Sequence, residues 1–157
     1  MEDAAAVAEL LQASYPKLMA SSYDGESLAP ALKLMTKANP SLLGSGTYYV
    51  AELSRGLLAG CGGWTLERPG AGTIEPHVAH IRHFAVSPAW TRRGVGSAIY
   101  RRCESAARAL GVIAFECHSS FNAEHFYRAL HFKRSREIDV ELQPGVVLRA
   151  VLMRREL

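Results

Sequence analysis

The stretch from His80 to Ala98 changes from a strand-like apolar pattern to the start of a helix across a short turn that contains glycine. Its first part is apolar and partly β-branched and ends at a Ser-Pro dipeptide, which is typical of a strand followed by a turn. The turn contains two arginines and two alternate glycines, Arg92-Arg93-Gly94-Val95-Gly96. Glycine permits a tight bend and close ligand approach, and a helix N-terminus offers free N–H groups to phosphate oxygens. The pattern therefore predicts a strand, a turn and a helix suited to binding an anion.

Two common phosphate-binding loops do not fit this turn. The dinucleotide-binding fingerprint needs a third glycine at the position where Ile99 stands. The nucleotide triphosphate loop needs a Gly-Lys-Ser/Thr sequence, which the chain lacks. From the glycine pair alone, a turn with no ligand is an equally good interpretation.

The turn resembles the acyl-CoA-binding signature of the GNAT superfamily of N-acetyltransferases, Gln/Arg-x-x-Gly-x-Gly/Ala after a strand. Thr91 departs from that pattern, because it stands where the family usually has Gln or Arg. A second segment, residues 121–132, is similar to the family's later Asn-Ala-x-x-Phe-Tyr-x-x-x-Gly-Phe motif, with His131 in place of the glycine. The two motifs occur in the family's order, and the resemblance covers residues 46–153 well and the N-terminal part weakly.

The periodicity of the chain predicts the order α, α, β, β, β, α, β, α, β, β, which implies a mixed sheet with helices packed on it. A chain of 157 residues suits one domain. We therefore expect residues 1–157 to form a single GNAT-like N-acetyltransferase domain of the mixed α/β class, with a central sheet flanked by helices. The family's first strand should be absent or vestigial, because the first helical pattern covers about residues 3–14.

Local patterns add detail to this outline. Residues 47–64 read as a β-hairpin, and its glycines at positions 60, 62 and 63 predict a bulge or a close contact with another backbone. The helix after the glycine turn should end at Gly111 and place Leu110 on its buried face. Asn122 is a candidate N-cap for the next helix.

Composition and charge narrow the functional classes. The 48% hydrophobic and 21% charged content is that of a globular protein, and the net charge of +3 is modest. No basic stripe interleaved with aromatic residues occurs, so nucleic acid is not the expected partner. The three cysteines have no metal-type spacing, and the start of the sequence does not read as a secretion signal. We expect a cytoplasmic protein that does not enter a membrane.

The resemblance implies acetyl-CoA as cosubstrate, CoA as product, and an amine on a small molecule or peptide as acceptor. It also makes a homodimer compatible with the sequence, since dimers are common among relatives. In the family, a splayed strand pairs with the pantetheine arm of the cofactor, and the amides of the glycine turn hold its pyrophosphate. The positions carried over for cofactor binding are Phe84, Ala85, Val86, Thr91, Arg92, Arg93, Gly94, Val95, Gly96, Ser97 and Asn122.

Tyr127 occupies the position at which the family often has a tyrosine that protonates the departing thiolate. A thiol has a pKa of about 8.5 and a phenol of about 10, so this transfer needs no extreme tuning. The general base is less defined. His80 stands where some histone-directed relatives carry a glutamate base, and His83 lies further along the same strand. Glu116 and His118 flank the end of the neighbouring strand, and many relatives use ordered water instead.

The sequence thus predicts an N-acetyltransferase that transfers an acetyl group from acetyl-CoA to a primary amine by direct attack on the thioester. The alternative is an acyl-CoA-binding sensor or interaction module with the same fold and no turnover. A third interpretation, an acetyltransferase directed at nucleic acid, is disfavoured by the modest charge. Acceptor specificity should reside in residues 12–45, where Tyr15 and Tyr23 lie in or beside the segment that joins the first two helices, and in the loop at 66–78.

Overall fold

The computed structural model describes residues 3–157 of the chain. The helices are α1 (Asp3–Met19), α2 (Gly25–Met35), α3 (Pro40–Leu43), α4 (Val95–Ala109) and α5 (Glu124–Ala129). The strands are β1 (Tyr48–Ser54), β2 (Leu57–Thr65), β3 (Val78–Val86), β4 (Ala114–Ser119), β5 (Lys133–Gln143) and β6 (Val146–Glu156). This confirms the predicted order and adds the short helix α3. No strand precedes α1 within the described residues, as expected.

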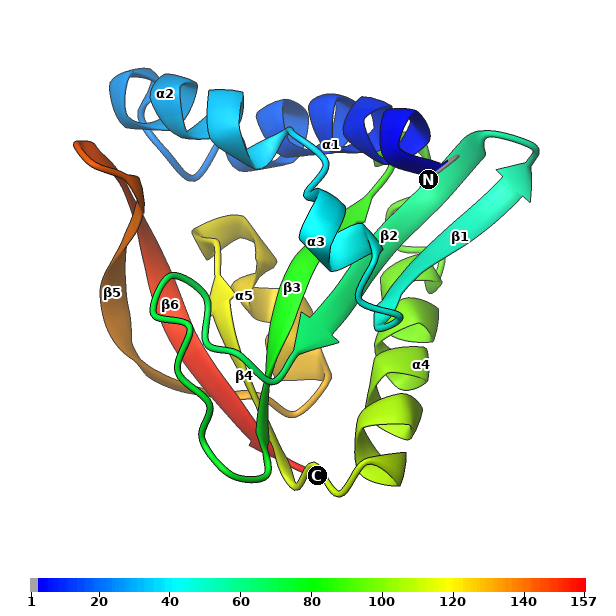
Figure 1. The fold of residues 1–157 in the computed structure, drawn as a ribbon. Coiled ribbons are helices and arrows are strands. Elements are labelled where there is room, and N and C mark those ends of the chain that lie inside the picture. Colours follow the sequence, from blue (N-terminus) through cyan, green and yellow to red (C-terminus); the bar gives the residue numbers. More distant parts are fainter. Residues whose placement is uncertain (1–2) are drawn as a thin grey trace.

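The strands form one six-stranded sheet in the order β1-β2-β3-β4-β6-β5 (Figure 1). Strands β3 and β4 are parallel, and all other neighbours are antiparallel. The parallel pair is joined through α4, because a parallel connection needs a crossover. The mixed α/β class predicted from the periodicity is therefore correct.

Apolar residues on the two faces of the sheet pack against different helices. On one face, Trp64, Ile81 and Phe115 join Ile99 and Cys103 of α4 in the largest buried cluster. The other face is covered by the N-terminal helices, in two clusters. Leu58, Cys61 and Ala85 of the sheet pack against Val7, Leu10 and Leu11 of α1, and Leu148 packs against Met19, Leu28 and Ala31. The sheet is thus buried on both sides near its centre.

Helix α1 continues beyond the predicted end at residue 14 and reaches Met19, with Pro16 inside it. Proline removes one helical hydrogen bond and usually ends or kinks a helix. Here the buried stripe of the helix extends from Leu11 to Met19, both of which are nearly inaccessible to solvent. Packing of the last turn against the sheet offsets the bond lost at Pro16. Tyr15 therefore lies inside the helix rather than in the segment that joins α1 and α2.

Helix α4 ends as predicted, with Gly111 in the left-handed region at a φ of 77°. The prediction that Leu110 lies on the buried face of α4 was wrong, because Leu110 is 69% exposed. Leu110 is the C-cap residue, where the chain leaves the helical path, and Val112 takes the buried place instead. None of the helices within residues 3–157 has the length and apolar character that a membrane crossing requires.

Candidate functional site

Strands β3 and β4 pair only at their beginnings. Their register runs from Val78 opposite Ala114 to His80 opposite Glu116, and β3 then continues to Val86 without β4 as a partner. The two strands separate past His80, so the β4-facing edge of the second half of β3 has no strand beside it. A backbone edge of this kind can accept an extended ligand as an additional strand.

The separation coincides with a bulge in β3. The register with β2 shifts between Cys61 and Gly63, and His83 has a φ of 48°, in the left-handed region. A Cβ atom at Gly62 would overlap the ring of Phe84. The predicted irregularity at the strand glycines is therefore confirmed, and the Phe84 side chain occupies the space where a Gly62 side chain would lie.

A cavity of about 790 Å³ lies at this separation. Its walls come from both sides of the sheet: from β3 and β4, from α1, α2 and α5, from the β5–β6 hairpin, and from the loop between β2 and β3. Of the predicted site residues, His83, Phe84 and Tyr127 line it, and so does His118. The volume falls in the range of roughly 300–1,000 Å³ that is common for small-molecule sites.

The glycine turn precedes α4, as the sequence predicted. Gly94 is the N-cap residue with a φ of 82°, and a Cβ there would meet no other atom within 4 Å. The space above Gly94 is open, and the first N–H groups of α4 lie beside it. Gly96 has a different role, because a Cβ there would come within 3.0 Å of the Phe126 ring. Glycine is thus needed at one position for conformation and at the other for packing.

The side chains of the turn do not all point outward to a ligand. The Thr91 hydroxyl donates a hydrogen bond to the Pro88 carbonyl at 3.2 Å, and the Arg93 guanidinium lies 5.0 Å from the centre of the Trp90 ring. Arg92 is exposed and adopts a φ of 63°. Val95 is half-buried, like Ser97 in the first turn of α4. The groups of the turn best placed for an anion are therefore the backbone N–H groups and Arg92, because Arg93, although also exposed, lies over the Trp90 ring.

Asn122 does not cap α5, so that prediction was wrong. It lies in a short 3-10 turn, residues Phe121–Ala123, and Ala123 occupies the cap position without a side-chain hydrogen bond. The Asn122 side-chain oxygen is buried and has no hydrogen-bond partner. A buried oxygen without a donor is costly, and such groups in native folds usually meet a ligand or a water molecule.

Tyr127 is 6% exposed and lies on the inner face of α5, with its ring packed against Phe84, Phe126 and Phe132. Burial raises the pKa of the Tyr127 phenol well above its ordinary value of 10, and the neighbouring Cys117 acts in the same direction. The phenol is therefore protonated at neutral pH and able to act only as a proton donor or as a neutral acceptor.

The two candidate histidines on β3 occupy different environments. His83 lines the cavity, whereas His80 is 1% exposed and does not. Burial lowers the pKa of each imidazole to about 4, so both are neutral at pH 7. Both ring nitrogens of His80 lack a hydrogen-bond partner, and its Nδ1 lies 3.8 Å from Glu116 Oε2. Of the two, only His83 has access to a molecule in the cavity.

Glu116 is engaged by two arginines. Arg68 of the β2–β3 loop donates to one carboxylate oxygen at 3.2 Å, and Arg154 of β6 donates to the other at 3.4 Å. His118 faces the cavity, and burial lowers the pKa of its imidazole, with Arg68 acting in the same direction. The negative charge of Glu116 is thus compensated by its neighbours.

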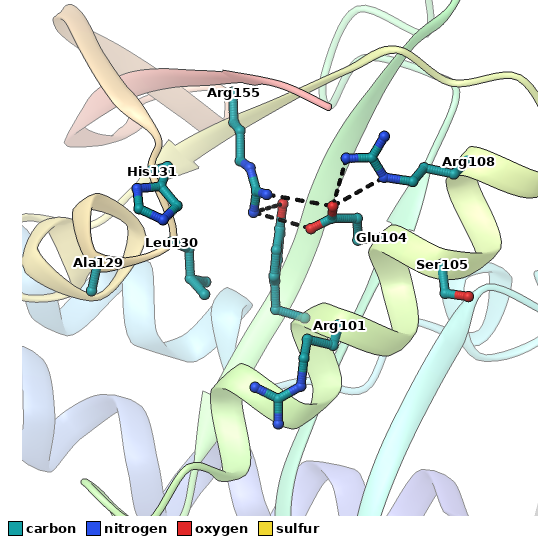
Figure 2. A pocket seen from close by; sticks show the side chains of 9 residues that line it. Arg101, Glu104, Ser105, Arg108, Ala129, Leu130, His131 and Arg155 are labelled. Atoms are coloured by element: carbon teal, nitrogen blue, oxygen red, sulfur yellow. Dashed lines mark hydrogen bonds and ion pairs between the residues drawn. The ribbon is translucent and has the colours of Figure 1, made fainter.

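A second pocket, of about 540 Å³, lies between α4, the end of α5 and β6 (Figure 2). Figure 2 shows Arg108 and Arg155 directed at Glu104, with contacts of 2.8 Å and 3.0 Å. His131, which replaces the family's glycine and has a φ of 66°, also lines this pocket. None of the predicted catalytic or cofactor residues does, so the two pockets are separate sites.

Sequence reasoning missed Arg82, a charged residue within the apolar pattern of β3 that lines the large cavity. The only signal was the interruption of that pattern. The expected specificity segments do contribute to the cavity, through Tyr15, Met19 and Met35 from the helices and through residues 69–71 from the loop. Tyr23 lies elsewhere, where its hydroxyl donates to the Arg149 carbonyl and accepts from the Phe121 N–H.

Several solved structures are similar to this chain across nearly its whole length. A GCN5-related N-acetyltransferase from Rhodopseudomonas palustris is 23% identical, with a TM-score of 0.80 over 99% of this chain and 91% of that one. PaiA N-acetyltransferase from Thermoplasma acidophilum, in complex with coenzyme A, is 13% identical, with a TM-score of 0.71 over 99% and 94%. Ribosomal-protein-alanine N-acetyltransferase from Brucella melitensis is 17% identical, with a TM-score of 0.60 over 98% and 95%. At these identities the likeness establishes the fold.

The sequence itself establishes the family. The model of the acetyltransferase (GNAT) family matches residues 5–132, which include the glycine turn, the separated strands and α5. No curated protein sequence gives a significant match. The chain therefore belongs to the GNAT acetyltransferase family, whose members use acetyl-CoA as the acyl donor.

Proposed function

We propose that this protein is an N-acetyltransferase that transfers the acetyl group of acetyl-CoA to a primary amine by direct attack on the thioester. The observation that carries the proposal is the separation of β3 and β4, which opens a cavity lined by His83, Phe84 and Tyr127. A sensor without turnover would need the separated strands and the glycine turn, but not a buried phenol at the cavity wall.

Three features fit acetyl-CoA. The open space over Gly94 and the N–H groups of α4 suit the pyrophosphate, and the exposed Arg92 adds positive charge. The unpaired edge of β3 at residues 84–86 suits the amide-containing pantetheine arm. The orphaned side-chain oxygen of Asn122 suits one of that arm's N–H groups. Acetyl-CoA supplies a thioester, whose acyl carbon is open to attack by an amine.

Residues of the chain would then carry out two proton transfers, one from the amine and one to the departing sulfur. The proton that the amine nitrogen loses as the new C–N bond forms would pass to the His83 imidazole, which lines the cavity and is neutral at pH 7. The Tyr127 phenol is protonated at neutral pH, as its ordinary pKa of 10 already requires and as burial reinforces, and it would give a proton to the departing sulfur. Backbone N–H groups on the free edge of β3 would stabilise the negative charge that develops on the thioester oxygen.

The test compares Tyr127→Phe with Tyr49→Phe. Both changes remove only a phenol oxygen, and Tyr49 lies on β1, where its ring contacts Arg102 at 5.3 Å. We expect Tyr127→Phe to lower the rate of CoA thiol release by about 100-fold or more, with acetyl-CoA affinity by calorimetry unchanged. Tyr49→Phe should behave like the unmodified protein. Binding of acetyl-CoA without thiol release from any amine would overturn the enzyme and favour the sensor.

A further inference from the structure

We infer that the acceptor is a small amine that carries both a carboxylate and an apolar side chain, the chemistry of an apolar α-amino acid. The inference rests on the proposed function, because it names the acceptor for the same site. Three properties of the cavity lead to it: an arginine with no carboxylate at ion-pairing distance, acidic side chains that are paired with arginines or exposed at the rim, and a set of apolar residues in the wall.

Arg82 supplies the positive charge. It lies on β3 at the cavity wall, and its Nη1 donates a hydrogen bond to the Thr65 hydroxyl at 3.1 Å. No carboxylate within residues 3–157 forms an ion pair with its guanidinium. Burial lowers the pKa of Arg82 from its ordinary value of 12.5, and the group is still charged at neutral pH. A half-buried guanidinium with free donors favours a planar anion, and a carboxylate matches its geometry.

None of the acidic groups among residues 3–157 lies within ion-pairing distance of Arg82, although the charge of Glu67 acts on it from further away. Glu116 already accepts hydrogen bonds from Arg68 and Arg154. Asp139 is at the rim, with a side chain that is 71% exposed and that pairs with Arg149 at 3.6 Å. Glu141 also lines the cavity, and it is exposed and forms no ion pair within residues 3–157. A polyamine or a lysine-rich peptide would bring further positive charge to Arg82, whereas the carboxylates that line the cavity lie exposed at its rim. The charge distribution therefore favours an acceptor with its own anion.

One face of the β5–β6 hairpin supplies apolar residues to the cavity wall, and Asp139, Glu141 and Gln143 of the same hairpin also line the cavity. Ile138 stands opposite Ala150 in the register, and Val140 stands opposite Leu148, so all four share one face of the hairpin. All four line the cavity, together with Met19 and Met35 from the helices above them. Leu148 and Ala150 are 4% and 3% exposed. An acceptor that reaches this wall gains free energy in proportion to the apolar surface it buries.

The loop between β2 and β3 limits the size of the acceptor. Residues 69–71 line the cavity, and the preceding Arg68 ties the loop to Glu116 on β4. The cavity is therefore bounded by the loop, the helices and the hairpin. A volume of about 790 Å³, shared with the end of the acyl donor, fits a single amino acid better than a folded protein.

The experiment compares leucine with leucinamide as acceptors, with CoA thiol release as the readout. The two molecules share the side chain and the amine, and only leucine has a carboxylate. The amine of leucinamide loses its proton more easily, so a preference for leucine cannot come from amine basicity. We expect kcat/KM to be at least ten-fold higher for leucine.

Arg82→Gln should lower kcat/KM for leucine by about 10- to 100-fold, since a hydrogen bond to a charged group is lost. The preference over leucinamide should disappear, and Arg82→Lys should restore part of it. Arg55→Gln is the matched control, because Arg55 lies exposed in the β1–β2 turn. Acetyl-CoA affinity by calorimetry should be the same in all four proteins.

The apolar wall is tested by the ratio of kcat/KM for leucine to that for alanine. Val140→Ser should reduce this ratio several-fold, because the valine lines the cavity. Val147→Ser is the control, since Val147 is 45% exposed, is not part of the cavity wall and adjoins Leu148 on the opposite face of β6. Equal effects of the two changes would overturn the assignment of the wall.

Assays with other amines distinguish a failure of this inference from a failure of the proposed function. Faster acetylation of leucinamide, spermidine, a lysine peptide or an aminoalkyl phosphate than of leucine would overturn the inference and leave the N-acetyltransferase intact. Acetyl-CoA binding with no acetylation of any of these amines would instead overturn the proposed function.

Discussion

The phenol of Tyr15 on α1 donates a hydrogen bond to the backbone carbonyl of Phe84 on β3, with the two oxygens 3.2 Å apart. The bond joins residues 69 positions apart in the sequence and connects the N-terminal helix to the bulged part of the strand. Burial raises the pKa of Tyr15 far above its ordinary value, so its hydroxyl is always available as a donor. The helix that covers the cavity is thus fixed directly to the strand edge that forms its wall.

Tyr15→Phe should reduce the free energy of unfolding by about 0.5–1.5 kcal/mol, the net value of one hydrogen bond. Tyr23→Phe should cost more, because the Tyr23 hydroxyl bonds both the Arg149 carbonyl and the Phe121 N–H. Urea denaturation of the three proteins measures both values. An unchanged midpoint for Tyr15→Phe would mean that the contact between α1 and the bulge contributes nothing to stability.

Gly62→Ala should destabilise the protein by about 1–3 kcal/mol, because the added methyl group would overlap the Phe84 ring and force it to move. Gly25→Ala is the matched control. Gly25 is the first residue of α2, and a Cβ there would meet no atom within 4 Å. Thermal denaturation should separate the two variants clearly. Similar melting temperatures would show that Phe84 can leave its place over Gly62 at no cost.

The outcome at these glycines shows how far the sequence could predict the fold. A glycine-containing strand and a glycine turn before a helix are local signals, and both were interpreted correctly. At the bulge, His83 adopts a φ of 48°, and the residue type histidine does not predict that conformation. The separation of β3 from β4 was therefore expected only from the family resemblance.

The cavity residues likewise divide into those that a local motif predicted and those that the sequence did not indicate. Tyr127 was expected at the cavity because its motif fixes its place on α5, whereas Arg82 was missed because one charged residue within an apolar strand pattern does not show whether it faces a cavity. Asn122 has the residue type of a helix cap, but a 3-10 turn places Ala123 at the cap position. The preference of asparagine for the N-cap position is overridden here by the path of the chain between β4 and α5.

Asn122→Ala should weaken acetyl-CoA binding by about ten-fold without lowering stability, because it removes a buried oxygen that has no partner in the protein. Asn39→Ala should show the reverse pattern. The Asn39 side chain accepts a hydrogen bond from the Leu42 N–H at 3.2 Å and caps α3, so its loss should cost about 1 kcal/mol of stability. Calorimetry and urea denaturation of both variants test the pair. A loss of stability in Asn122→Ala with unchanged affinity would contradict a role in cofactor binding.

The stability of the protein should fall as the pH is lowered from about 6.5 to 4, in part because of His80. Burial lowers the pKa of His80 from its ordinary 6.5 to about 4, with Glu116 opposing the shift. Between pH 4 and 6.5 His80 is protonated in the unfolded chain but neutral in the folded protein. The stability that neutral His80 contributes is therefore complete above pH 6.5 and is lost as the pH falls through 4. One such group changes the slope of stability against pH by up to about 1.4 kcal/mol per pH unit. His80→Gln should remove its share of the slope. Urea denaturation at several pH values measures the slopes, and equal slopes in the variant and the unmodified protein would rule out His80 as a source of the pH dependence.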